Sequence, residues 1–284
     1  MIFPTERLGV GLGYRPELSE DLDRYPDEVD FLEFTGDHCF NPSLMTQALA
    51  LSRRIPGVCH FLGLSIGTAE PLDPEYMEKV AEVLRQLQPP WFSDHLAVTR
   101  VQGVDLGHLS PVAFTEETVE LVSRKAIYLQ ERFGMPFLLE NITSHFTLPG
   151  ASFTEWDLLT KIVERSGCGI LLDVNNVYVN AYNAGYDPYD FLRGIPLDRV
   201  LQIHLGGAVM RDGVMIDSHG HPVPDPVFEL LEFVCDNSPV SAILLERDRN
   251  MPAFDELAGE MRRARSILNG ARTAESAQTK ARLA

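Results

Sequence analysis

The sequence predicts a single (β/α)8 barrel of the triose-phosphate-isomerase type, from three observations. Short apolar runs alternate with amphipathic segments eight times along the 284 residues. That length is long for one ordinary domain but fits a barrel of roughly 250 residues. No Gly/Ser-rich or Pro-rich linker divides the chain. We therefore expect one domain over residues 1–270, followed by a flexible tail over 271–284 that is polar and rich in small residues.

Eight short apolar runs read as strands, because each is bounded by glycine, proline or polar turn residues. Seven of them, in chain order, are residues 8–14, 29–35, 57–62, 91–98, 136–140, 199–205 and 240–246. The sixth strand starts at Gly169, and its core, 170–172, is apolar throughout, which is typical of a parallel strand buried on both faces. It leads directly to Asp173, Asn175 and Asn176.

The segments between the strands predict helices. They cover residues 17–24, 41–54, 73–88, 115–133, 154–166, 188–193, 226–235 and 255–268. Asp73 followed by Pro74 suits an N-cap with proline at the first helical position. Two connections, 97–115 and 206–226, are longer than the usual two to six residues of such a fold. Both follow strand ends, on the face that carries the active site in barrels of this kind.

Composition limits the class of partner. The chain has 24 basic and 41 acidic residues and a net charge of -17, which opposes unspecific binding to nucleic acid or to an anionic membrane. No apolar run reaches the 18 residues of a membrane span, and the N-terminus lacks the pattern of a signal peptide. The four cysteines are scattered, with Cys39 expected to be the most exposed thiol. We expect a cytoplasmic protein with reduced thiols.

Six consecutive strands deliver an imidazole or a carboxylate at their carboxyl ends. These residues are His60, His95, Glu140, Asp173, His204 and Glu246, and the loop after His204 adds Asp217 and His219. Any single one of them is more simply a hydrogen-bonded structural histidine or a helix-capping acid. Taken together, however, they would bury many polar groups at one end of the barrel, which is costly unless the groups share partners. Such ligand types suit iron, manganese or zinc, and their number exceeds what one ion needs. The sequence therefore predicts a multinuclear metal site.

Over residues 9–266 the chain resembles the multinuclear non-heme iron-dependent oxidative enzymes, such as the oxidases of methanobactin and 3-thiaglutamate biosynthesis. The resemblance rests on the combination of seven segments rather than on any one of them: residues 59–60, 93–96, 138–141, 171–177, 202–207, 216–220 and 244–248. The chain departs from the family pattern at residues 35–40 and at Asp94, where glutamate is usual. These departures bear on the substrate more than on the metal ligands.

The resemblance implies a barrel that holds two or three iron ions, in mixed Fe(II) and Fe(III) states, with dioxygen as co-substrate. One ion would be held by His60, His95 and Glu140. A second would be held by Glu140 as a bridge, together with Asp173, His204 and Glu246. A third would use Asn176, Asp217 and His219. The implied activity is oxidation of a ribosomally made precursor peptide, most often at cysteine, with a small partner protein or a recognition domain that delivers the peptide.

Two other classes are compatible with the same ligand types. A divalent-metal hydrolase or isomerase of the endonuclease-IV or xylose-isomerase kind would use a similar set with zinc, manganese or magnesium. The charge of -17 and the lack of a basic stripe oppose a DNA substrate. A non-catalytic metal-binding or scaffold protein would hold metal but consume no dioxygen, and the long loops, which suggest access for a substrate, count against it.

Overall fold

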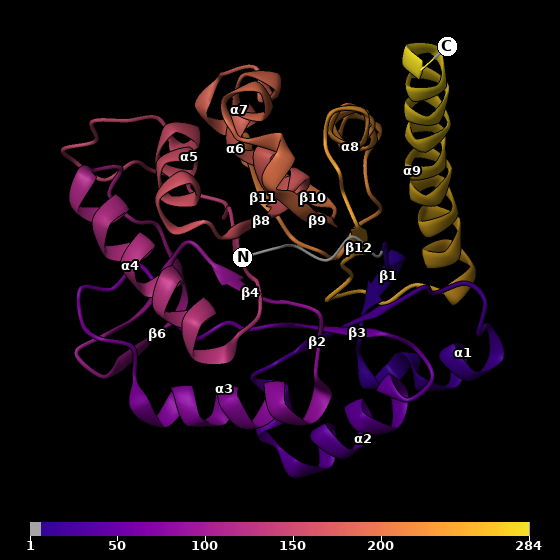
Figure 1. Ribbon diagram of the computed structural model, residues 1–284, viewed down its shortest axis with the longest axis horizontal. Helices are drawn as coiled ribbons and strands as arrows, with labels where there is room; N and C mark the ends of the chain where they lie inside the picture. The colour runs from indigo at the N-terminus through magenta and orange to yellow at the C-terminus, as the bar shows by residue number, and fades with distance from the viewer. Residues whose placement is uncertain (1–6, 284) are drawn as a thin grey trace.

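The predicted barrel is confirmed by the computed structural model, which describes residues 7–283, with side chains for residues 7–271. Eight parallel strands close on themselves in the order β1-β12-β9-β8-β7-β4-β3-β2, with helices packed outside (Figure 1). The barrel strands are β1 (Gly9–Gly13), β2 (Leu32–Thr35), β3 (Gly57–His60), β4 (Phe92–His95), β7 (Phe137–Glu140), β8 (Gly169–Asp173), β9 (Val200–Leu205) and β12 (Ala242–Leu245). Seven lie inside their predicted runs, and β8 extends one residue beyond its apolar core, to Asp173.

The helices agree with prediction at most positions. They are α1 (Ser19–Arg24), α2 (Pro42–Ser52), α3 (Pro74–Leu87), α4 (Glu116–Phe133), α5 (Glu155–Ser166), α7 (Pro188–Gly194), α8 (Asp225–Asn237) and α9 (Phe254–Leu283), with short 3-10 turns at Pro16–Leu18, His38–Phe40 and Leu197–Arg199. Helix α9 continues past the predicted end at residue 268. The flexible tail over 271–284 stays a prediction, since residue 284 and the side chains from 272 onward lie outside the described part.

Helix α6 (Val174–Ala184) was not predicted. Its sequence is rich in valine and asparagine, which have low intrinsic helix propensity. The helix forms because the Asp173 side chain accepts a hydrogen bond from the backbone N–H of Asn176 and caps its first turn. Burial of Val174 and Val177 in the core between the barrel and its helices then stabilises it.

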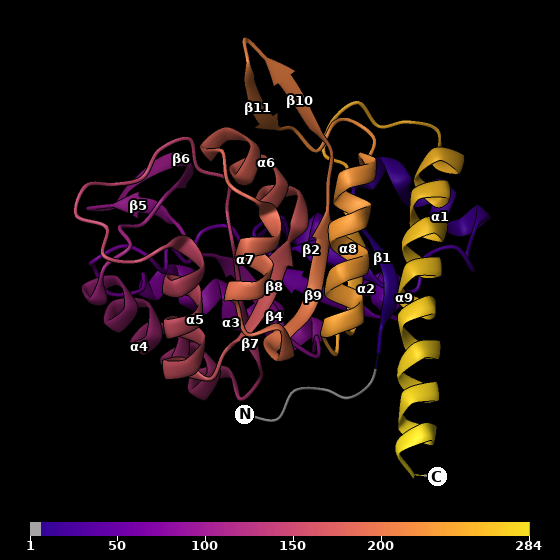
Figure 2. The same cartoon turned by 90° about the horizontal axis from the view of Figure 1, so that it is seen from above.

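Two β-hairpins occupy the long connections that were predicted as loops. They are β5 (Val98–Val101) with β6 (Val104–Ser110), and β10 (Ala208–Arg211) with β11 (Val214–Asp217). Each has a two-residue turn whose residues both have positive φ, the geometry that matches the natural twist of a hairpin. Because they follow β4 and β9, both rise from the carboxyl end of the barrel, and Figure 2 shows β10–β11 projecting from it.

Alternation along the strands creates two separate apolar cores. Outward-facing residues such as Leu139 and Leu172 pack against the helices. Inward-facing residues fill the interior of the barrel: Phe31, Val58, Trp91, Leu138, Leu171, Leu201, Ala242 and Leu244. This interior layer closes the barrel from below, so the next inward-facing side chains lie on an apolar floor.

Cys39 is the most exposed of the four thiols, as predicted, but all four are buried. The Cys39 side chain is only 7% exposed and packs in the outer core, because the 3-10 turn His38–Phe40 directs it inward. Burial raises the pKa of the Cys39 thiol to about 11, which makes it a poor nucleophile at neutral pH. Among the helices of the described part, none is long and apolar enough to cross a membrane.

Candidate metal centre

In several barrel strands, the polar residue of the site comes two positions after a residue of the interior apolar layer, so both side chains point to the same side of the strand. Leu138 points into the barrel, so Glu140, two residues later, points inward as well. The same step leads from Leu171 to Asp173 and from Val58 to His60. The chemistry-bearing side chains thus converge above the apolar floor at the carboxyl ends of the strands, and the predicted ligands from six strands do meet there.

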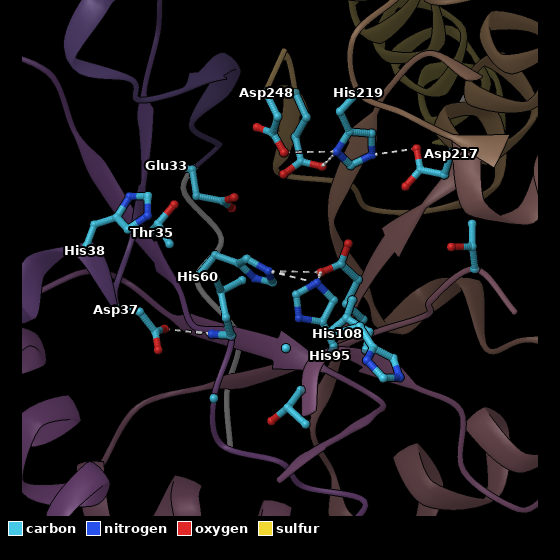
Figure 3. Close-up of a pocket in the computed structure, with 18 of the residues that line it drawn as sticks. Glu33, Thr35, Asp37, His38, His60, His95, His108, Asp217, His219 and Asp248 are labelled. Atoms are coloured by element: carbon cyan, nitrogen blue, oxygen red, sulfur yellow. Dashed lines mark hydrogen bonds and ion pairs between the residues drawn. The ribbon is translucent and has the colours of Figure 1, made fainter. Parts of the chain in front are cut away.

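Glu140 lies at the centre of this convergence. One of its oxygens, Oε2, is 3.3 Å from Nε2 of His60 and 3.3 Å from Nε2 of His95, and the two nitrogens are 3.3 Å apart (Figure 3). The other oxygen, Oε1, is 3.2 Å from Nδ1 of His204. Ligands bound about 2.1 Å from one ion, at angles between about 90° and 109°, lie about 3.0–3.4 Å apart. The first three donors have the spacing of ligands around one ion, and Glu140 also reaches a second group.

The second group gathers around His204, which is fully buried. Its Nδ1 atom is 3.3 Å from Oε2 of Glu246, and the ligand atoms of Glu140, Asp173 and His204 lie within 4.8 Å of one another. Asp173 uses one oxygen to cap α6, while the other, Oδ2, has no hydrogen-bond partner among the described residues. Helix capping and ligation are therefore compatible in this one carboxylate.

The third group surrounds His219. Its Nε2 atom is 3.0 Å from Oδ1 of Asp217, and its Nδ1 atom is 3.3 Å from Oε2 of Glu246 (Figure 3). Asp173 lies at 3.8 Å from Nε2. The backbone of His219 has a φ of 44°, an uncommon conformation that concentrates at functional sites. A Cβ atom at Gly206 would lie 2.6 Å from its ring, so the imidazole position requires glycine there.

Asn176 was predicted as a ligand of the third ion. Its amide nitrogen donates to the carbonyl of Asn141 at 3.0 Å, which fixes the orientation of the side chain. Its Oδ1 atom is buried and has no partner among the described residues. The neighbouring Asn175 donates to Oδ1 of Asp217 at 2.9 Å and so orients that acid. Helix α6 therefore supplies one candidate ligand and one positioning side chain.

Prediction missed two residues that bond the imidazoles, of which Glu33 also lines the cavity and lies with His204 and Glu246 in a group that could hold a metal ion. Ser93 Oγ is 2.9 Å from Nδ1 of His60. Glu33, which is 4% exposed, places Oε2 at 3.1 Å from Nε2 of His204, and Gln202 donates to the same oxygen at 2.5 Å. In His60 one nitrogen bonds Ser93 and the other faces Glu140, and in His204 one nitrogen bonds Glu33 and the other faces Glu140 and Glu246, which is typical of metal-binding histidines.

The donor set fits a group of cations. Atoms that face the cluster are buried without a hydrogen-bond partner among the described residues: Glu140 Oε2, Asp173 Oδ2, Asn176 Oδ1, His204 Nδ1 and His219 Nε2. Several of these atoms lie 3.0–3.8 Å from other ligand atoms without hydrogen-bond geometry, and shared cations would satisfy them together. Iron, manganese and zinc accept this mixture of imidazole and carboxylate.

The pKa values of the ligand residues also favour bound cations. Burial would raise the pKa of Glu140, but the imidazoles of His95, His204 and His60 hold it at about 2. Burial would lower the pKa of His95, but the Glu140 and Asp94 carboxylates raise it to about 9. The pKa of Asp173 is raised well above its usual range by burial and by the neighbouring acids. The raised pKa values of His95 and Asp173 both reflect an excess of neighbouring carboxylates, which multivalent cations would offset.

A cavity of about 660 Å³ opens above the centre. Its floor includes His60, His95 and Glu140, and its walls carry residues from both hairpin connections, among them His108 and Asp217. His38 also lines it, whereas His145 is exposed elsewhere. The volume lies in the range of small-ligand pockets.

Comparison with known sequences finds one family model and several similar proteins, each matching most of this chain. The family model described as "RiPP precursor modification enzyme MbnB/TglH/ChrH" matches residues 9–269. A "UPF0276 protein" of Caulobacter vibrioides is 36% identical over 263 residues, which cover 91% of this chain and 93% of that protein. Another from Anaeromyxobacter sp. is 35% identical over 270 residues, covering 94% and 95%.

Solved structures share the barrel at low sequence identity. Endonuclease IV from Thermus thermophilus is 20% identical with a TM-score of 0.55, covering 93% of this chain and 99% of that chain. A D-tagatose 3-epimerase-like protein is 14% identical with a TM-score of 0.57, covering 95% and 99%. At these identities the likeness shows the fold alone.

Proposed function

Because the chain belongs to the MbnB/TglH/ChrH family of RiPP precursor modification enzymes, which act on ribosomally synthesised precursor peptides, we propose that it uses iron and dioxygen to oxidise a cysteine of such a peptide. The family establishes that the chain is an enzyme of peptide modification. The metal, the oxidant and the modified residue are our proposal. This proposal assigns the predicted iron ions to the donor atoms that gather at the carboxyl end of the barrel.

The main support for this proposal is the position of Glu140 between two groups of imidazoles. Its two oxygens face different histidines, at 3.3 Å from His60 and His95 and at 3.2 Å from His204. A carboxylate so placed can bridge two ions. A cluster of ions fits this proposal, and the identity of the metal and the use of dioxygen distinguish it from hydrolysis or isomerisation with the same ligand types.

The residues would divide as follows. His60, His95 and Glu140 would hold one ion, Glu140 with Asp173, His204 and Glu246 a second, and Asn176, Asp217 and His219 a third. Bound iron would supply one-electron chemistry with dioxygen and a site that accepts a cysteine thiolate. The apolar layer under the cluster excludes water from below, and Glu33 and Ser93 fix the imidazole orientations.

The cavity is open, so a chain segment can enter it from the hairpin side. We propose that a precursor peptide presents its cysteine there, and that a small partner protein or recognition domain assists its delivery. The family membership supports a peptide substrate. The partner rests on the resemblance alone.

The test is reconstitution without air, with ferrous iron, followed by exposure to air with candidate cysteine-bearing precursor peptides. We expect His60→Ala and Glu140→Ala to lose bound iron and to leave the peptide mass unchanged, while wild type alters it. Glu131→Gln, at an exposed acid on α4 that does not line the cavity, serves as the matched control and should keep both properties. Full iron content and activity in Glu140→Ala would refute the proposal, as would tight zinc binding with hydrolysis and no dioxygen uptake.

A further inference from the structure

We propose that the outer edge of β10 binds an extended segment of the precursor peptide as a third strand of the β10–β11 hairpin. The inference rests on the proposed function for the nature of its ligand, a peptide. It adds where that peptide is held and by which atoms, which the metal centre does not specify.

The turn of the hairpin fixes which backbone groups point outward. Asp212 and Gly213 form a two-residue turn with φ values of 51° and 83°. Such a turn makes Arg211 and Val214 a hydrogen-bonded pair, so Met210 opposite Met215 is a non-hydrogen-bonded pair. The N–H and C=O groups of Met210 and of Met215 therefore point away from the hairpin, on opposite edges.

The β11 edge is closed. Asn183 of helix α6 accepts from the N–H of Met215 at 2.9 Å and donates to its C=O at 2.7 Å. One asparagine side chain thus occupies both outward groups of β11, in the way a neighbouring strand would. This contact independently confirms the direction in which the Met215 groups point.

The β10 edge is open. Met210 is 45% exposed, and within the described residues no hydrogen bond takes its outward N–H or C=O. An unpaired strand edge is a template for another extended chain. Proteins usually protect such edges with charges, proline or a covering element. Asn183 covers the β11 edge here, whereas β10 has no such cover among the described residues and carries only the charge of Arg211 at its end.

The open edge is continuous with the cavity. Ala208 pairs with Asp217, and Asp217 lines the cavity beside His219. Met210 shares a hairpin face with Ala208, because side chains alternate along a strand, so its exposed side chain lies on the face that carries Asp217. A strand added to β10 would lie roughly 10 Å from β11, two strand spacings away. A few further residues would bring a cysteine from that strand into the cavity.

This mode of binding suits an enzyme of precursor peptides. Backbone hydrogen bonds hold the peptide regardless of most of its side chains, and the alternate side chains that face Met210 add an apolar contact. The occupant is thus an extended peptide segment flanking the modified cysteine, rather than the cysteine itself.

The test combines hydrogen exchange with a backbone substitution. The probe is the candidate cysteine-bearing peptide that the iron-loaded protein modifies, added to that protein without air. We expect it to slow exchange of the Met210 amide at least tenfold. Met210→Pro removes the outward N–H and spares the β10–β11 bonds, since proline is tolerated at an outward-facing edge position. It should raise the Kd for the peptide at least tenfold, with unchanged iron content and thermal midpoint.

Met210→Ala is the matched control, because it keeps the N–H and removes only the side chain. It should weaken binding less than Met210→Pro. Peptide oxidation with unprotected Met210 and an unaffected Kd in Met210→Pro would overturn this inference and leave the proposed function intact. Protection of Met210 without peptide, in a dimer that Met210→Pro dissociates, would assign the edge to a second copy of the chain instead. A protein that neither binds nor modifies the peptide would overturn both proposals.

Discussion

The Oε2 atom of Glu33 lies 3.1 Å from Nε2 of His204, although the two residues are 171 positions apart in the chain. A carboxylate at this distance can accept a proton from Nε2, so that Nδ1 of His204 becomes the ligand atom once its own proton is lost. That Nδ1 atom faces Glu140 and Glu246 and has no hydrogen-bond partner among the described residues. Glu33 therefore orients His204 for ligation, a role found repeatedly behind metal-binding histidines.

Glu33→Gln should weaken binding of the second ion at His204, because an amide holds the imidazole in the required tautomer less firmly than a carboxylate does. We expect an affinity loss of roughly 10–100-fold at one site, with the remaining iron retained. Iron titration followed by elemental analysis measures it. Glu131→Gln, with the same charge change on α4 outside the cavity, should leave every site intact. Equal iron affinity in Glu33→Gln and wild type would show that Glu33 does not position His204.

Substitutions at Asn176 test the third ion. Its unpartnered Oδ1 atom is the candidate ligand, so Asn176→Ala should lower the iron-to-protein ratio by up to one ion. Asn176→Asp keeps an oxygen at the same place and should retain the ion. Elemental analysis of both variants after identical loading is the measurement. A ratio unchanged in Asn176→Ala would remove Asn176 from the ligand set.

Gly206→Ala should displace His219, because the new Cβ atom would lie 2.6 Å from Cδ2 of the ring. Overpacking of this kind costs about 1–3 kcal/mol of folding free energy. We expect a lower unfolding midpoint together with loss of the third ion, measured by denaturant unfolding and metal analysis. Gly259→Ala, on helix α9 with open space around it, is the matched control and should be neutral or slightly stabilising. If Gly206→Ala matched this control in both measurements, the close approach would be unimportant.

Lys125 makes stability depend on pH away from the metal centre. Its side chain is buried and donates to the carbonyl of Thr68, and burial lowers its pKa from 10.5 to about 8. Between pH 8 and 10.5 the unfolded chain then binds more protons than the folded one, so stability rises with pH in that window. Relative to Lys125→Met, wild type should gain about 2 kcal/mol there.

Urea unfolding at pH 7.5, 9 and 10 measures this difference between the two proteins. Lys79→Met, at an exposed position of α3, provides the control, and its difference from wild type should stay flat over the same range. A flat difference for Lys125→Met as well would show that the ammonium is not desolvated in the folded protein.

The barrel and most of the centre could be predicted because both follow from short-range patterns. Strands and helices alternate visibly, and six strands end in ligand-type residues. Glu33 escaped prediction although its pattern matches that of Glu140: Phe31 fills the barrel interior as Leu138 does, and each is followed two residues later by the inward acid. The same two-residue pattern is thus present at Glu33. Two more strand residues, Phe34 and Thr35, follow it, so the prediction places Glu33 inside the strand rather than at its end.

Other features depended on tertiary contacts. Helix α6 has poor intrinsic propensity and forms through the Asp173 cap and burial of its valines. The β10–β11 turn does contain an Asp-Gly pair, a local hairpin signal that was read only as part of a loop. The pairing of Asn183 with Met215 joins segments 32 residues apart and has no signature in either one.

The most direct test of the central claim is the mass of the cysteine-bearing precursor peptide after incubation with this protein under four conditions. These combine iron-loaded or zinc-loaded protein with air or its absence. We predict a mass change, located at cysteine by fragmentation, only with iron and air together. The same mass change with zinc, or without dioxygen, or no change with iron and air, would contradict an iron-dependent oxidation.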